Sequence, residues 1–79
     1  VAEDLNGLAS IEYLDGDHES AERDFTRVLA LYRRLWGDEH PDTATVMNNL
    51  ARVLLEQRKF APARTLLLRS VEIDRRNKD

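Results

Sequence analysis

The chain contains an internal repeat with a constant offset of 42 residues. Residues 5–37 align with residues 47–79 without a gap, and the apolar residues match in kind. Periods of 20–50 residues are typical of solenoid proteins, whose stacked units bury apolar faces that one unit cannot bury alone. The identical pairs are Asn6 and Asn48, Leu8 and Leu50, Ala9 and Ala51, Ala21 and Ala63, Arg27 and Arg69, Arg33 and Arg75, and Arg34 and Arg76.

The apolar residues of the first repeat predict two helices separated by a turn at Asp15-Gly16-Asp17. Gly16 suits the left-handed conformation at a helix end, and Asp17 suits the N-cap of the next helix. Gly37 ends that second helix. The first stripe consists of Leu5, Leu8, Ala9 and Leu14, and the second of Ala21, Phe25, Val28, Leu29, Tyr32, Leu35 and Trp36.

The second repeat predicts two more helices. Pro41 suits the first position of the third helix, where a missing N–H costs nothing. The negative charge of Asp42 interacts favourably with the dipole at the start of that helix. This helix continues to about Gln57, and Pro62 is tolerated in the first turn of the fourth. The third stripe consists of Met47, Leu50, Ala51 and Leu54, and the fourth of Ala63, Leu67, Val71 and Asp74.

Alanine occupies the same two positions in each repeat, twelve residues apart: Ala9 and Ala21, then Ala51 and Ala63. Small side chains let two helix backbones approach closely, and larger ones would cost about 1–3 kcal/mol by overpacking. We therefore expect each pair to lie where its two helices cross.

The composition argues against several functions. There is no cysteine, and His18 and His40 are the only histidines, so disulfides and thiolate or imidazole metal cages are not expected. Apolar runs such as Val53-Leu54-Leu55 are far shorter than a span of about 20 residues. No secretory signal is visible, and we expect a cytoplasmic protein.

The charge is divided unevenly between the two repeats. Residues 1–42 carry four arginines and eleven acidic residues, a net −7, whereas residues 43–79 carry eight basic and four acidic residues, a net +4. The division fits units that stack with opposite charges across their joins. Chance variation on solvated helix faces explains it equally well.

Several segments match a known repeat pattern. Asn48-Asn49-Leu50-Ala51 is followed by Phe60 and Ala63, and residues 36–44 (WGDEHPDTA) form the linker between repeats. These residues resemble the tetratricopeptide repeat, in the 42-residue form found in kinesin light chains and in many bacterial signalling proteins. The resemblance implies an all-α, right-handed superhelix of two helix-turn-helix hairpins with four antiparallel helices. Repeat one would cover about 1–36, the linker 37–41 and repeat two about 42–77.

The sequence departs from this pattern at a few positions. Glu12 and Leu54 stand where the family usually places an aromatic residue, and His18 stands where Tyr or Phe is common. Arg58 replaces the helix-ending glycine that repeat one keeps as Gly16. We expect the first repeat to pack less well than the second.

No residue pattern indicates catalysis or a cofactor. The acidic loop at Asp15, Asp17 and Glu19 fails as a calcium loop, because Ser20 and Thr26 occupy the positions that require Gly and Glu. His18 lacks an accompanying nucleophile, and no glycine-rich phosphate loop is present. The arginine pairs near the ends of the second and fourth predicted helices are explained by the helix dipole, so we expect no nucleic acid partner.

The resemblance places the first helix of each repeat on a concave face that holds an extended peptide. Glu3, Leu14, Thr45 and Glu56 belong to this face. The asparagine amides offer a donor and an acceptor for a peptide backbone, and Arg52 offers a carboxylate contact. Hydrogen bonding of the asparagines within the scaffold is the alternative. The predicted peptide-binding residues are Asn6, Ser10, Tyr13, Asn48, Arg52 and Leu55.

We therefore expect a protein-interaction scaffold with a protein or peptide partner, acidic where it meets Arg52, and no catalytic, metal or membrane role. Helical arrays normally need about three repeats. The chain is thus expected to belong to a longer array or to cover its ends by self-association. The alternative function is a homo-oligomerisation or intramolecular regulatory module of a larger signalling protein.

Overall fold

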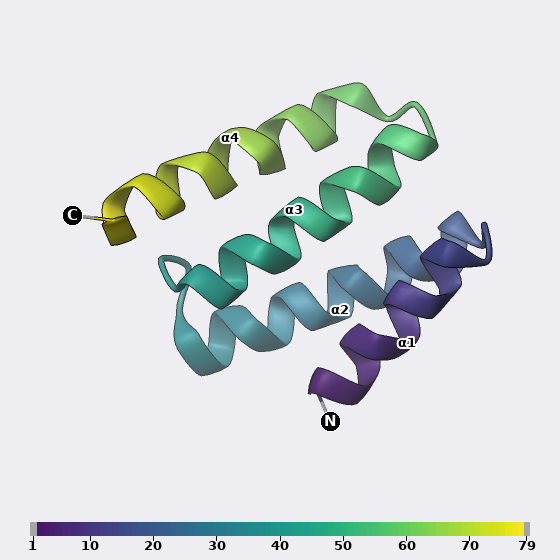
Figure 1. Ribbon diagram of the computed structural model, residues 1–79, viewed down its shortest axis with the longest axis horizontal. Helices are drawn as coiled ribbons and strands as arrows, with labels where there is room; N and C mark the ends of the chain where they lie inside the picture. Colours follow the sequence, from purple (N-terminus) through teal and green to yellow (C-terminus); the bar gives the residue numbers. More distant parts are fainter. Residues whose placement is uncertain (1, 79) are drawn as a thin grey trace.

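A computed structural model describes residues 2–78, with side chains from residue 4, and consists of four helices. These are α1 (Ala2–Leu14), α2 (His18–Trp36), α3 (Pro41–Glu56) and α4 (Phe60–Lys78). Each helix packs against the next one in the chain, so α2 and α3 are each covered by two neighbours (Figure 1). The predicted all-α fold of two helix-turn-helix hairpins is confirmed.

The first two turns follow the sequence rules. Gly16 has a φ of 84°, and the Asp17 side chain accepts a hydrogen bond from the Ser20 backbone N–H at 3.3 Å. In the second turn, His40 caps α3, because its Nδ1 accepts the Asp42 N–H at 3.0 Å. Asp17 thus caps α2 and Pro41 begins α3 as predicted, whereas the capping role of His40 was not predicted.

The turn between α3 and α4 uses a less suitable residue. Arg58 adopts a φ of 62°. Among the described residues it is the only one other than glycine with a positive φ. It stands 42 residues after Gly16, so both hairpins make their turn with the same backbone conformation. An L side chain is strained in this conformation.

The core lies along the crossings of successive helices. The four alanines Ala9, Ala21, Ala51 and Ala63 are all fully buried, as their spacing predicts. The largest fully buried side chains are those of Met47, Ile73, Val28, Val46 and Val53, together with Thr43.

Several apolar residues assigned to buried stripes are instead exposed. Leu8 is 49% exposed while its equivalent Leu50 is 5% exposed, because α2 covers α3 but no described helix covers that flank of α1. On α4, Val71 is 52% exposed, and Ser70 and Ile73 are buried in its place. The exposed group also includes Leu14, Leu35 and Trp36, whose ring stacks on that of His40.

The looser packing expected of repeat one is found only in part. Among its described side chains α1 buries only Ala9, whereas α3 buries eight residues. However, α2 buries five residues and α4 only three. Burial thus depends on how many neighbours a helix has and not on which repeat it belongs to.

Candidate functional site

A hollow of about 220 Å³ lies where α1, α2 and α3 meet. Phe25 of α2, buried to 3% exposure, contributes part of the aromatic surface of this hollow. The other lining residues are Ser10, Tyr13 and Leu14 of α1 and Asn49 and Arg52 of α3. The hollow therefore combines apolar and aromatic surface with an amide and a guanidinium group.

The structure brings together three of the six predicted peptide-binding residues. Ser10, Tyr13 and Arg52 line the hollow. Asn6, half-buried, lies one helical turn before Ser10, and on α3 Asn48 is half-buried and Leu55 41% exposed; none of these three lines the hollow. Of the further concave-face positions, Thr45 and Glu56 are exposed, Leu14 lines the hollow, and the side chain of Glu3 lies outside the described residues.

Two lining residues were missed by sequence reasoning. Asn49 lies three residues before Arg52, and residues at that spacing share a helix face. The two consecutive asparagines in the sequence could have indicated Asn49 as well as Asn48 as a binding residue. Phe25 was assigned to the core alone, but a buried aromatic ring can also form the floor of a depression.

The side chains of Asn6 and Asn48 form no hydrogen bond within the part of the chain that the structure describes. The Asn6 Oδ1 is buried there without a partner, while the Asn6 backbone oxygen accepts a bond from the Ser10 hydroxyl at 3.0 Å. Asn48 likewise has no side-chain hydrogen bond to residues 4–78. The described scaffold therefore provides no hydrogen-bond partner for either amide side chain.

A carboxyl pair lies beside the hollow, between α1 and α2. The pKa of Glu12 is raised, first by a side-chain hydrogen bond to Asp24, then by burial and by the negative charges of Asp24 and Asp17. Asp24 is only 3% exposed. The Arg23 Nε and the Arg27 Nη1 lie 3.6 and 3.9 Å from its Oδ1. The surroundings of Glu12 thus favour its protonated form more than water does, and in that form Glu12 donates to Asp24.

The described residues contain neither a cluster of possible metal ligands nor a helix that could span a membrane. No three His, Cys, Asp or Glu side chains between residues 4 and 78 are grouped to hold a metal ion. His18 is half-buried, with its ring centroid 5.7 Å from that of Tyr13. No described helix is long and apolar enough to cross a membrane.

A comparison with known families matches residues 2–76 to the tetratricopeptide repeat. None of the curated proteins compared matches the chain. Repeats of this type generally serve as protein-interaction modules and not as catalytic sites. Because the match covers nearly the whole sequence, the chain belongs to the tetratricopeptide repeat family.

Proposed function

We propose that this chain is a scaffold that binds an extended peptide of a protein partner across α1 and α3. The observation that carries the proposal is the hollow with Phe25 at its floor and Arg52 at its rim. Its volume of about 220 Å³ is below the 300–1,000 Å³ that is usual for small-molecule sites. It suits one apolar side chain of a longer ligand.

Polar groups beside the hollow would orient the peptide. The Asn49 amide supplies both a donor and an acceptor for a peptide bond. Arg52 is exposed and forms no ion pair with residues 4–78, so its guanidinium is available to a carboxylate. The proposed ligand is therefore a peptide with an apolar residue followed by an acidic one.

The test uses short synthetic peptides that carry an apolar residue followed by glutamate, with binding measured by fluorescence anisotropy. Arg52→Gln should weaken binding at least about tenfold, since a hydrogen bond to a charged group contributes about 1.5–3 kcal/mol. Arg64→Gln, an exposed change on α4, is the matched control. Equal loss in both variants, or no loss in Arg52→Gln, would contradict the proposal.

Asn48 and Asn49 distinguish two possible binding faces. Asn49 lines the hollow, whereas Asn48 belongs to the face that the family resemblance implies. If the hollow binds the peptide, Asn49→Ala should weaken binding more than Asn48→Ala. The opposite order would favour the binding face implied by the family resemblance. Helix content, measured by circular dichroism, should stay unchanged in both variants.

A second candidate function is self-association through the outer helices. Leu8 and Ile11 on α1 and Leu68 and Val71 on α4 are each about half exposed or more, and the repeats differ in net charge. Ile11→Glu should reduce the apparent mass in light scattering if copies stack through α1. A monomer over a wide concentration range would argue against this function.

We also propose that the repeats are of the 42-residue kind found in kinesin light chains. The gapless offset of 42 residues supports this, as does the turn at His40-Pro41-Asp42, where each residue helps to start α3. A longer natural chain with further turns of this sequence would agree with it, and one with repeats of another length would not.

A further inference from the structure

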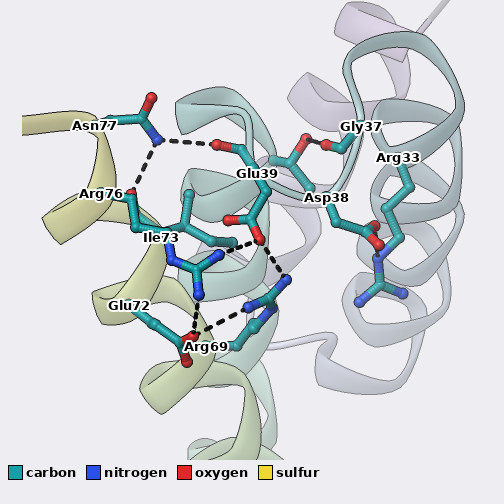
Figure 2. Close-up of polar contacts among 10 residues, drawn as sticks. Arg33, Gly37, Asp38, Glu39, Arg69, Glu72, Ile73, Arg76 and Asn77 are labelled. Carbon is teal, nitrogen blue, oxygen red and sulfur yellow. Dashed lines mark hydrogen bonds and ion pairs between the residues drawn. The ribbon is translucent and has the colours of Figure 1, made fainter.

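In the second repeat, two arginines of α4 hold one carboxylate of the turn before α3. The Arg69 Nη2 and the Arg76 Nη1 both donate to Glu39 Oε1, at 3.0 and 2.8 Å (Figure 2). Glu72 lies between the arginines and accepts from both, at 3.5 and 3.1 Å. The Asn77 Nδ2 adds a bond of 2.9 Å to the Glu39 backbone oxygen. These residues attach the turn to α4.

The first repeat carries the same arginine pair on α2. Arg27 and Arg34 precede Arg69 and Arg76 by the repeat offset of 42 residues. Among the described residues, no carboxylate accepts hydrogen bonds from both Arg27 and Arg34 as Glu39 does from Arg69 and Arg76.

The bridging carboxylate is also missing in the first repeat, because Ala30 stands where Glu72 stands in the second. Arg34 forms no hydrogen bond or ion pair with the residues that the structure describes, and Arg27 has only Asp24 at 3.9 Å. The positive charge of this pair is therefore less neutralised than that of Arg69 and Arg76.

The space beside the first pair is open where the second is filled. A depression of about 330 Å³ is lined by Leu5, Arg27, Ala30, Leu31 and Arg34. Leu5 and Leu31 are half-buried, whereas their equivalents Met47 and Ile73 are fully buried. The depression thus lies where the turn with Glu39 lies in the second repeat.

We infer that Arg27 and Arg34 form a binding site for a glutamate carboxylate, presented by a polypeptide turn like that of residues 36–42. The Arg69 and Arg76 contacts give the geometry: both guanidinium groups donate to one oxygen, and such charge-assisted bonds are among the strong ones in proteins. Leu5 and Leu31 receive the apolar side of the turn. This site goes beyond the proposed peptide groove, with which it has no lining residue in common.

The test adds a fluorescent peptide with the sequence of residues 36–44 to the intact chain. We expect saturable binding that Arg34→Gln or Arg27→Gln weakens at least tenfold and that added salt weakens. The same peptide with glutamine in place of Glu39 should bind at least tenfold more weakly. Arg75→Gln, an exposed change on α4, should have no effect.

Three variants and one spectrum separate this site from the others. Binding that persists in Arg34→Gln but is lost in Arg52→Gln or Arg76→Gln would overturn the inference, because the peptide would occupy the groove or displace Glu39. Absence of saturable binding at millimolar peptide would overturn it as well. Amide shifts in ¹⁵N spectra should concentrate on α2 around Arg27 and Arg34, and unchanged helix content shows that each variant is folded.

Discussion

Glu12 and Asp24 bring two carboxyl groups together between α1 and α2, at positions that Leu54 and Leu66 occupy in the second repeat. The two acidic residues are twelve apart, as are the buried alanines Ala9 and Ala21. Two carboxyl groups thus stand between the helices of the first repeat at positions where the second repeat has two leucines. The burial of Asp24 and the raised pKa of Glu12 both follow from this position.

Glu12→Gln should stabilise the protein at about pH 7, because the amide donates to Asp24 without a charge. The folded state raises the Glu12 pKa and so binds this proton more tightly than the unfolded state. Stability from this group is full below the ordinary pKa of 4.5 and falls as the pH rises towards the folded value. The gain in Tm should therefore shrink in acid. Glu56→Gln, an exposed change at the end of α3, is the control. If Glu12→Gln raised the Tm equally at about pH 7 and in acid, the prediction would be contradicted.

Arg58→Gly should raise the free energy of unfolding by about 0.5–1 kcal/mol. The change removes the strain of an L residue at a φ of 62°, and the lost chain entropy of glycine offsets part of the gain. Urea unfolding measures the change. Gly16→Ala, at a φ of 84° in the equivalent turn, should be destabilising. A less stable Arg58→Gly variant would show that the Arg58 side chain contributes more than its backbone costs.

Glu22→Gln should destabilise the protein by about 0.5 kcal/mol near neutral pH, as is usual for exposed pairs. Glu22 accepts hydrogen bonds from Lys59 Nζ at 2.9 Å and Gln57 Nε2 at 2.7 Å, and so attaches α2 to the turn before α4.

The pH dependence of this variant is opposite to that of Glu12→Gln. The bond from Lys59 is the first cause that lowers the Glu22 pKa, so its stabilisation is present above the ordinary value of 4.5 and is lost as the pH falls through the folded value. Thermal unfolding should show a deficit at neutral pH that disappears in strong acid. A deficit that is unchanged in acid would assign the effect to packing.

The helix boundaries could be predicted from the sequence because their causes are local. Asp17, Gly16 and Pro41 act within one turn of their own positions, and each does what its residue type favours. The burial of side chains was predicted less well, because it depends on which other helices cover each residue. Leu8 and Leu50 are identical in type and repeat position, and only the second has another helix against it.

The candidate site was only half predicted for a related reason. The family resemblance placed Ser10 and Tyr13 on one face of α1, and both residues line the hollow. The hollow depends on how three helices meet, so the contributions of Phe25 and Asn49 followed only from their arrangement in space. A search for pairs twelve residues apart would have found Glu12 and Asp24.

Ala51→Met should cost about 1–3 kcal/mol, because Ala51 is fully buried and a larger side chain would force the helices at this crossing apart. Ala61→Met, an exposed change in the first turn of α4, should alter stability by no more than about 0.5 kcal/mol. Urea unfolding of the two variants compares the same gain in volume with and without burial. If the two variants were equally stable, the helix crossing at Ala51 would accommodate a larger side chain. Close helix packing would then not explain the small residue in this repeat.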